Sequence, residues 1–448
     1  MSSTLTVDYV IIGAGAMGMA FADTLVSDSN YTMAIIDRYD SPGGHWNLSY
    51  PFVRLHGPSS IYGVNSRPMP SDNAPAGTHL ASRHEILDYY DRVMHETLLA
   101  SDRVSYLPLH EVTGQEAGST TVQARSLMTG AVTEIVATRR IVDATYMNIT
   151  VPAMNQRGYE VDPGVSLIPV SELSQLSAGP DRFVVVGAGK TGMDACIWLL
   201  NRGVDPDRIR WIVPREAWLV NRATPQAATE SSELLMLGAL NSAAEVFYAL
   251  EESGMFMRRN TNEAPESFRC ATVDTNELEQ LRQIKDTVHL GRVRRVGTTT
   301  VELEKGSVSS SPDALYVDCS ADGLTWQKPL KPIFEANRIT LQPLLSCLLP
   351  VSAAVAAKLE SADLDDAQRN NLAAPIHNPT RAVDLLNFLA IRADRMLRWS
   401  VDPHIGDWFV ESRLGRCLPG TEKAKEPEFQ SEGANLVTHL TALAKAGA

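Results

Sequence analysis

Asp8-Tyr-Val-Ile-Ile-Gly-Ala-Gly-Ala-Met-Gly18 and Arg182-Phe-Val-Val-Val-Gly-Ala-Gly-Lys-Thr-Gly192 are two copies of one pattern, an apolar run followed by glycines with the spacing GxGxxG. Sequence typical of a helix follows each copy, so each predicts a strand, a tight turn and a helix. This is the arrangement of a Rossmann-like dinucleotide-binding turn. Because both copies have this context, the chain is expected to bind two dinucleotides within an α/β fold.

The three glycines of such a turn have separate roles. The first allows the tight turn, the second lets the backbone approach a pyrophosphate, and the third lets the helix pack closely on the strand. Unpaired N–H groups and the dipole at the helix N-terminus then favour the anion. These roles fall to Gly13, Gly15 and Gly18 in the first copy, and to Gly187, Gly189 and Gly192 in the second.

The residues after each copy distinguish the two sites. After the first, the apolar run 32–36 ends in Asp37, whose carboxylate can accept hydrogen bonds from ribose hydroxyls. After the second, the run 209–213 ends in Pro214 and Arg215, with no acid. Since arginine suits a 2′-phosphate, NADPH is expected there, and a solvated surface charge is the alternative reading of Arg215. Lys190 is either a phosphate or nicotinamide-side contact or a helix-surface lysine.

Composition excludes some partners. The chain has 448 residues, a formal charge of −13 and a pI near 5.3, which argue against nucleic acid or an anionic membrane surface as a partner. Five scattered cysteines form no CxxC pair, and the N-terminal sequence lacks the features of a signal peptide, so a cytoplasmic protein is expected. The most apolar stretch, 344–357, is interrupted by Pro350 well short of a bilayer span. No metal site is expected.

The order of segments predicts one domain inserted in another. Ile141–Thr145 and Ala314–Ala321 share a pattern of apolar strand, acid and small residues, and are expected to be the two crossings between the domains. The first domain is therefore expected over residues 1–150 and 310–448. The second is expected over 165–305, with a helical insertion at 223–273 that includes a helix at 233–252.

Local signals predict further elements of the first domain. Ser82-Arg-His-Glu85 is a capping box that should open a helix reaching about Leu99. Strand-like runs at 104–106, 120–127, 133–137 and 140–144 predict a β-meander.

The segment Gly43–Gly77 is dense in Pro, Gly, Ser and Asn, and a loop of this length is usually functional. It leaves the carboxyl ends of the predicted parallel strands, where ligands of such folds bind. Its candidate catalytic residues are Arg54, His56, Tyr62 and Asn65. His56 could orient or proton-balance a bound cofactor, and Arg54 could hold an anion. The alternative is that these side chains satisfy loop backbone groups.

Gly43-Gly-His-Trp46 and Val53-Arg-Leu-His-Gly-Pro-Ser59 resemble stretches of the flavin-containing monooxygenases (class B), the second being similar to plant auxin-forming, YUCCA-type members. The resemblance covers roughly residues 8–345. It implies FAD at the first site and NADPH at the second, hydride transfer to FAD, activation of O2 as a C4a-hydroperoxide, and oxygen transfer to a small-molecule substrate. The family's fingerprint FxGxxxHxxx(Y/F) is not present between Tyr146 and Pro180.

Two other functions stay open from the residues. One is an FAD- and NADPH-dependent oxidoreductase, a reductase or oxidase, that inserts no oxygen, and the other is a nucleotide-bound sensor without turnover. The oligomeric state does not follow from the sequence. The residues expected to bind the two cofactors are Gly13, Gly15, Ala16, Met17, Gly18, Asp37, Arg38, Gly44, His45, Trp46, Val112, Ala144, Gly187, Gly189, Lys190, Thr191, Gly192, Arg215 and Asp318.

Overall fold

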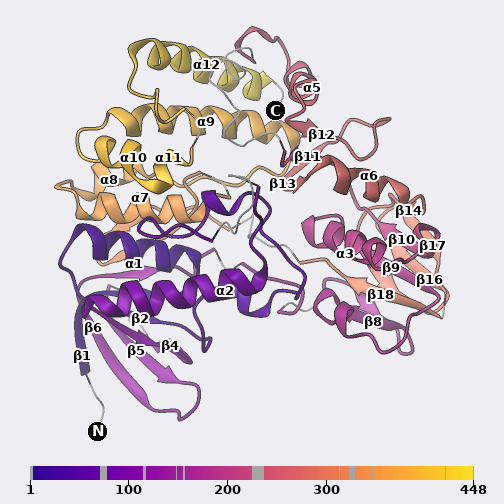
Figure 1. Cartoon of the computed structure of the whole chain (residues 1–448), viewed down its shortest axis with the longest axis horizontal. Coiled ribbons are helices and arrows are strands. Elements are labelled where there is room, and N and C mark those ends of the chain that lie inside the picture. The colour runs from indigo at the N-terminus through magenta and orange to yellow at the C-terminus, as the bar shows by residue number, and fades with distance from the viewer. Residues whose placement is uncertain are drawn as a thin grey trace.

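A computed structural model of the chain describes residues 4–70, 78–114, 118–147, 149–154, 157–223, 237–311, 313–321, 328–345, 347–418 and 420–446. The first glycine copy belongs to an eight-stranded sheet (Figure 1). Five of its strands run parallel, in the order β20 (Arg338–Thr340), β6 (Val132–Asp143), β1 (Thr4–Ile12), β2 (Met33–Ile36) and β3 (Val104–Leu107). Short β19 (Phe334–Glu335) pairs antiparallel with β20.

The predicted meander is wrong in two details. The run 104–106 forms β3, which pairs parallel with β2, and the meander instead starts at β4 (His110–Gly114) and continues through β5 (Thr121–Ser126) to β6. The runs 133–137 and 140–144 belong to the single strand β6. Its polar middle, Thr138-Arg139-Arg140, reads as a break, yet β6 pairs with β1 on both sides of it, at Ala137 and at Arg140, with a bulge between Val7 and Tyr9. The Thr138 side chain also bonds to Asp8, and Arg140 pairs with Asp366 at 2.8 Å.

The second glycine copy belongs to a separate, fully parallel sheet. Its strands run in the order β14 (Thr287–Val288), β10 (Ile209–Ile212), β9 (Arg182–Val186), β18 (Ala314–Asp318) and β8 (Ser166–Pro169). The chain thus leaves the first sheet after β6 and re-enters it at β20. The predicted α/β fold with two Rossmann-like sheets is confirmed, while the domain boundaries remain a prediction.

We call the parts of the chain built on these two sheets the first unit, with the first glycine copy, and the second unit, with the second copy. Two small sheets accompany the second unit. One contains β12 (Phe256–Met257), β11 (Ala217–Asn221) and β13 (Ser267–Val273), and the other β17 (Gly306–Ser309), β16 (Thr300–Leu303), β15 (Val293–Val296) and β7 (Glu160–Val161). Residues 224–236 of the expected helical insertion lie outside the described residues, as do 71–77 of the long loop. Of the expected helix at 233–252, the described residues form a 3₁₀ turn at Leu237–Ala239 and then α5 (Ala243–Glu252), where the Ser242 side chain accepts from the Glu245 N–H and caps the helix.

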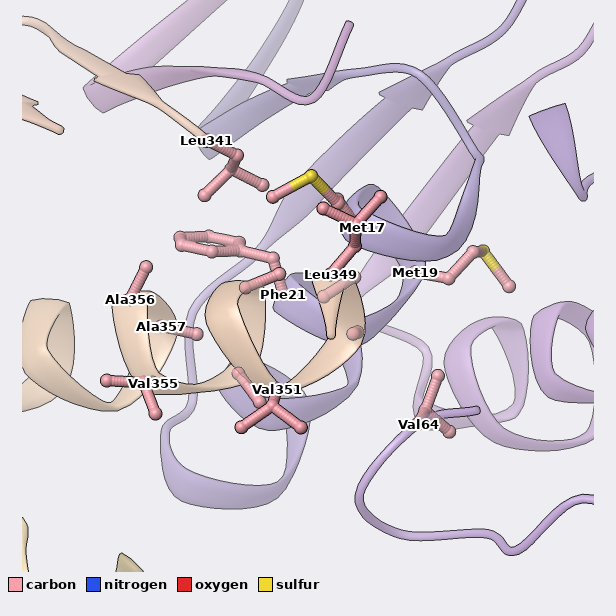
Figure 2. Close-up of a cluster of buried hydrophobic side chains, with 14 of the residues drawn as sticks. Met17, Met19, Phe21, Val64, Leu341, Leu349, Val351, Val355, Ala356 and Ala357 are labelled. Atoms are coloured by element: carbon pink, nitrogen blue, oxygen red, sulfur yellow. The ribbon is translucent and has the colours of Figure 1, made fainter. Parts of the chain in front are cut away.

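Helices α1 (Ala16–Asp28) and α7 (Leu349–Ser361) pack against one another beside the first sheet (Figure 2). Almost every residue of α7 is buried, and its alanines allow close approach to Phe21 and Met17 of α1. The capping box is confirmed at the start of α2 (Arg83–Arg92), which continues as π- and 3₁₀-helical turns to Ser101. No helix of the described part is long and apolar enough to cross a membrane.

The C-terminal helices cover α7 and reach the second unit (Figure 1). They are α8 (Asp366–Leu372), α9 (Ala382–Val401), α10 (Gly406–Glu411), α11 (Arg413–Arg416) and α12 (Pro427–Ala446). α9 packs on α12, and a β-bridge between Arg381 and Ser267 joins its start to β13.

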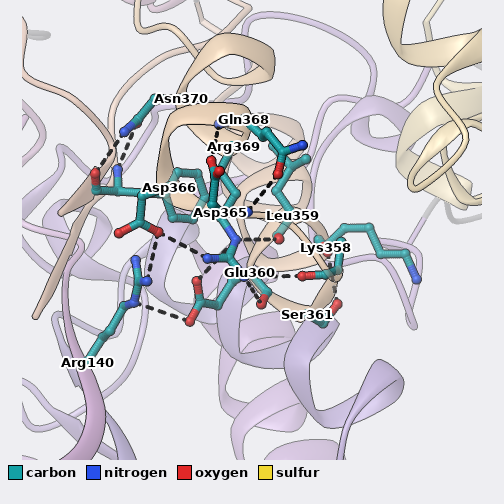
Figure 3. Close-up of polar contacts among 12 residues, drawn as sticks. Arg140, Lys358, Leu359, Glu360, Ser361, Asp365, Asp366, Gln368, Arg369 and Asn370 are labelled. Atoms are coloured by element: carbon teal, nitrogen blue, oxygen red, sulfur yellow. Dashed lines mark hydrogen bonds and ion pairs between the residues drawn. The ribbon is translucent and has the colours of Figure 1, made fainter. Parts of the chain in front are cut away.

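A buried ion network fixes α7 and α8 to the first sheet (Figure 3). Glu360 is 4% exposed, accepts from the Tyr9 hydroxyl at 2.8 Å and lies 3.5 Å from Arg140. Asp366 pairs with Arg140 and, at 3.0 Å, with Arg369. Removing one member would leave unpaired charge in a dry environment.

Candidate cofactor and active site

The first glycine turn has the backbone geometry that requires glycine. Gly13 has φ +103°, which L side chains rarely adopt. A Cβ on Gly18 would lie 1.9 Å from the Gly13 carbonyl oxygen, so only glycine lets α1 pack this closely on β1. Gly15 is the N-cap of α1 and no side chain caps the helix, which leaves its N-terminal N–H groups for a ligand.

The Gly43–Trp46 loop folds over this turn. The Gly43 N–H donates to the Ala14 carbonyl at 2.8 Å, and a Cβ on Gly44 would lie 3.1 Å from the Gly15 Cα. This close approach places His45 and Trp46 next to the start of α1. Neither side chain is fully buried.

The second turn repeats the first. Gly187 has φ +117°, and a Cβ on Gly192 would lie 2.1 Å from the Gly187 carbonyl oxygen. Gly189 is the N-cap of α3 (Lys190–Asn201), again without a side-chain cap, and a Cβ there would meet no atom within 4 Å. The open side of Gly189 and the uncapped N-terminus fit a pyrophosphate.

Backbone hydrogen bonds define equivalent positions in the two units. The first glycine of each turn donates to the last residue of the neighbouring strand, Ile36 in the first unit and Ile212 in the second. The next residue is Asp37 in the first unit and Val213 in the second. The second unit therefore has no carboxylate at the position that reads a ribose hydroxyl. Arg215 lies two residues further on and is exposed.

Asp37 is buried and tied to the glycine turn. Its carboxylate accepts from the Ala14 N–H at 2.5 Å and from the Tyr39 N–H at 2.8 Å. Burial raises its pKa, and these two hydrogen bonds oppose that rise. Each oxygen keeps a second lone pair that a ribose hydroxyl can use.

The remaining expected contacts of the first site lie around this carboxylate and the turn. Exposed Arg38 follows Asp37 directly, and Val112 lies in β4, whose first residue donates its N–H to the Asp37 carbonyl. The Ala144 N–H donates to Ile12 at 3.0 Å, which places Ala144 beside the turn. Ala16 and Met17 form the first turn of α1.

The acids at the ends of β6 and β18 are equivalent. Asp143 accepts from the N–H and hydroxyl of Thr145, and Asp318 accepts from the N–H and hydroxyl of Ser320. Asp318 is thus engaged in shaping its own turn next to the second glycine loop. The Cys319 N–H donates to Val186 there, just as Ala144 does in the first unit.

Lys190 is not a surface lysine. Its ammonium pairs with Asp194 one turn along α3, and both side chains are nearly buried. The Tyr50 hydroxyl, from the loop of the first unit, donates to the other oxygen of Asp194 at 2.6 Å, and it also bonds with the Thr191 side chain. Sequence reasoning missed Tyr50 and Asp194. The i,i+4 spacing of Lys190 and Asp194 could have revealed their ion pair, whereas no local signal marks Tyr50.

His56 lies close to this cluster. Its carbonyl oxygen accepts from Arg222 Nε at 2.9 Å, and Arg222 in turn pairs with Asp274 and Glu277 at 3.0 and 2.7 Å. Burial, helped by the nearby Lys190 charge, lowers the pKa of His56 to about 4. Burial also lowers the pKa of His45 to about 4. Both imidazoles are therefore neutral at pH 7, and Arg222, which sequence reasoning also missed, fixes the His56 backbone.

The other loop candidates lie elsewhere. Arg54 is exposed and donates to the Leu80 carbonyl at 2.9 Å, and Asn65 accepts from the Leu414 N–H at 3.2 Å. Both contacts hold the loop in place. Tyr62 is partly exposed, and burial raises its pKa, so its hydroxyl stays protonated. The structure thus brings His56 together with Lys190 and His45, but not with Arg54 or Asn65.

The buried thiols are unreactive. Cys196 and Cys319 act on one another electrostatically, but both are free and fully enclosed. Burial raises the pKa of each, so they are thiols rather than nucleophilic thiolates. No cluster of three metal-ligating side chains exists among the described residues.

Comparisons with known proteins identify relatives of the chain. The chain is 42% identical over 428 residues to the uncharacterized proteins Rv2000 of Mycobacterium tuberculosis (strain ATCC 25618 / H37Rv) and Mb2023 of Mycobacterium bovis, covering 92% of this chain and 78% of each relative.

Solved structures of similar fold are flavoenzymes. They include a double mutant of a flavin monooxygenase from Stenotrophomonas maltophilia (TM-score 0.51, 15% identity, 81% of this chain and 100% of that chain). Two others are OTEMO in complex with FAD and NADP (0.52, 15%, 79% and 84%) and closed cyclohexanone monooxygenase (0.51, 14%, 99% and 98%). At these identities the likeness extends to the fold alone. The profile of the pyridine nucleotide-disulphide oxidoreductase family matches residues 7–236, and the chain belongs to this family.

Proposed function

We propose that the chain is an NADPH-dependent FAD monooxygenase that acts on a small-molecule substrate with O2. The observation that carries the proposal is the hydrogen bond from Tyr50 to Asp194. It joins the loop beside the first glycine turn to the N-terminal part of α3 at the second. Two dinucleotides bound at these turns would therefore direct their redox-active ends towards the same loop, which contains His45 and His56.

The residues at the two glycine turns fit FAD at the first and NADPH at the second. N–H groups at the start of α1 would hold the FAD pyrophosphate, with Asp37 at its ribose. The start of α3 would hold the NADPH pyrophosphate. Val213 lies at the position equivalent to Asp37, and its side chain neither binds a 2′-hydroxyl nor repels a 2′-phosphate. The backbone N–H of Arg292 donates to Glu304, and together with the charges of Arg292, Arg215 and Arg294 it lowers the pKa of that carboxyl, so Arg215 lies close to two other arginines.

Flavin, when bound, supplies electron transfer and oxygen activation. The protein's own groups then govern charge and water. His56 and His45 are neutral, so His56 can accept a proton on a ring nitrogen without first losing one. Asp194 pairs with the Lys190 ammonium, so the positive charge of this lysine is compensated. Both histidines are partly buried, which limits the access of water to their rings.

Support for oxygen insertion comes from the fold shared with flavin monooxygenases and from the Gly43–Trp46 loop, which lies over the first turn. The buried, protonated state of Cys196 and Cys319 argues against disulphide reduction by these two thiols. The two rivals are an oxidoreductase that inserts no oxygen and a nucleotide-bound sensor.

One experiment separates the three functions. Purified, FAD-loaded protein would be incubated with NADPH, isotopically labelled O2 and a panel of small organic substrates. Label in an organic product supports the monooxygenase. NADPH consumption with release of all reducing equivalents as peroxide, and no labelled product, refutes oxygen insertion and favours the first rival. No NADPH consumption favours the sensor. In parallel, Arg215→Ala should weaken NADPH binding more than NADH binding, and equal losses would leave Arg215 as a surface charge.

A further inference from the structure

The guanidinium of Arg413 makes four hydrogen bonds to one irregular segment of the long loop. Nη1 donates to the Ser60 carbonyl at 2.8 Å, and Nη2 donates to the carbonyls of Tyr62 and Val64 at 2.8 and 2.7 Å. Nε donates to the same Val64 oxygen at 3.1 Å. Arg413 is the first residue of α11 and lies 349 positions beyond Val64 along the chain. The C-terminal helices therefore hold three alternate carbonyls of the loop, and Tyr62 is the middle one.

The residues that follow in this segment are held by side chains as well. Asp23 of α1 is fully buried and accepts from the Ser66 N–H at 2.9 Å and from the Ser66 hydroxyl. The Asn65 side chain accepts from the N–H of Leu414, the neighbour of Arg413. An irregular loop lacks strand partners for its backbone polar groups, so side chains have to bind them. Burial raises the pKa of Asp23, and the bonds from Ser66 and the charge of Arg413 oppose that rise, so Arg413 also stabilises this buried anion.

The helix that carries Arg413 is itself fixed in place. The Ser412 hydroxyl accepts from the Gly415 N–H at 3.0 Å and donates to the Phe409 carbonyl at 3.3 Å. A Cβ on Gly415 would lie 1.7 Å from the Phe409 oxygen, so α11 packs directly on the end of α10. The Thr421 hydroxyl donates to the Gly415 carbonyl at 3.0 Å. Because α11 cannot shift without displacing α10, the donors of Arg413 have a defined position.

Tyr62 lies where the two units meet. Its side chain packs against the core of the first unit, and the charge of Arg222, which directly follows β11 of the second unit, acts on its hydroxyl. The same Arg222 donates to the His56 carbonyl at 2.9 Å. One arginine from the second unit and one from the C-terminal helices thus hold the loop at His56 and at Tyr62. The Tyr62 phenol is protonated, so it can donate a hydrogen bond there.

We propose that Arg413 is a positioning residue, which holds the Tyr62 phenol beside the flavin of the proposed active site. The inference rests on the proposed function for the identity of that site, and it makes the C-terminal helices a part of it. Loss of the guanidinium would release three carbonyls, and Tyr62 with them. Lysine should replace Arg413 poorly, because a single ammonium lacks the planar fork of donors that reaches three carbonyls.

The first test is anaerobic reduction of the FAD-loaded protein by NADPH, followed by flavin absorbance in a stopped-flow instrument. Arg413→Ala should slow reduction at saturating NADPH by about tenfold or more, and should change the half-saturating NADPH concentration by less than about twofold. Guanidinium, added far below the concentrations that unfold proteins, should restore part of the rate. Tyr62→Phe should slow reduction similarly, and Arg413→Ala should add little to it, because the two residues act as one unit. Exposed Arg416→Ala, on the same helix, is the matched control and should react like wild type.

Fluorine NMR of fluorotyrosine-labelled protein gives a readout that needs no turnover. The Tyr62 resonance, assigned by its loss in Tyr62→Phe, should differ between FAD-loaded and FAD-free protein and should move towards its unfolded position in Arg413→Ala. The resonance of Tyr316 in β18 should stay in place, which shows that the variant is folded. The proposal is overturned if FAD or Arg413→Ala leaves the Tyr62 resonance unchanged, or if the rate losses of the two substitutions multiply. Wild-type protein that binds FAD but is not reduced by NADPH would refute the proposed function, and the resonances would still decide whether Arg413 positions Tyr62.

Discussion

A substitution at Gly189 should weaken nucleotide binding at the second glycine turn without preventing the chain from folding. A Cβ at this position would meet no atom within 4 Å, and its φ of −74° and ψ of 180° suit alanine. Gly189→Ala should therefore fold normally. We expect a loss of at most about 1 kcal/mol in the free energy of unfolding, which is the size of a helix N-cap preference.

The same methyl group should damage binding. It would occupy the open space in front of the N-terminus of α3, where a pyrophosphate must approach the backbone N–H groups. Losing one charge-assisted hydrogen bond costs about 1.5–3 kcal/mol, which corresponds to a roughly 10- to 100-fold weaker NADPH complex. Gly192→Ala differs, because its Cβ would lie 2.1 Å from the Gly187 oxygen and must displace the helix. That variant should lose stability as well as binding.

The assay is calorimetric titration with NADPH, with urea unfolding followed by circular dichroism on the same preparations. Gly179→Ala is the matched control, since a Cβ there also meets nothing and the residue is exposed outside the turn. It should change neither quantity. If Gly189→Ala binds NADPH with wild-type affinity, the reasoning that places a pyrophosphate at this turn is refuted.

Three further outcomes are expected. His56 has a pKa of about 4 in the folded chain and about 6.5 in the unfolded chain, so it contributes stability above pH 6.5 that is lost as the pH falls towards 4, at most about 3 kcal/mol. In His56→Asn the urea concentration at the unfolding midpoint should change less with pH over this range than in wild type. An equal pH dependence in both proteins would contradict the assignment. Glu360→Ala should lower the free energy of unfolding by about 1–3 kcal/mol, because the Tyr9 hydroxyl loses its acceptor and two arginines keep only Asp366 as a carboxylate partner. Exposed Asp363→Ala is the control, and equal small effects of the two substitutions would count against the network. Tyr50→Phe should lower the free energy of unfolding by about 1.5–3 kcal/mol, because the hydrogen bond to Asp194 is removed. Thermal unfolding measures this change. A variant as stable as wild type would show that the hydrogen bond does not contribute to stability.

Some of the site could be predicted because its cause is local. The capping box of Ser82 and the two glycine turns depend on residues a few positions apart, and their conformations follow from backbone sterics. Other expectations failed where a tertiary partner decided the outcome. The polar residues of β6 read as a gap between strands, but β6 pairs with β1 on both sides of them, and Asp366, far along the chain, supplies an ion-pair partner for Arg140.

The sequence by itself determined that this protein has two Rossmann-like units. The positive φ of Gly13 and Gly187, and the absence of room for a Cβ at Gly18 and Gly192 against the carbonyls of Gly13 and Gly187, are properties of each short turn. It did not determine which side chains of the long loop face the space between those turns. Only the tertiary structure decided that, because Tyr50 reaches Asp194 across 144 positions and the His56 backbone is held by Arg222 across 166. Contacts at such separations arise from the packing of whole units, which no local pattern encodes.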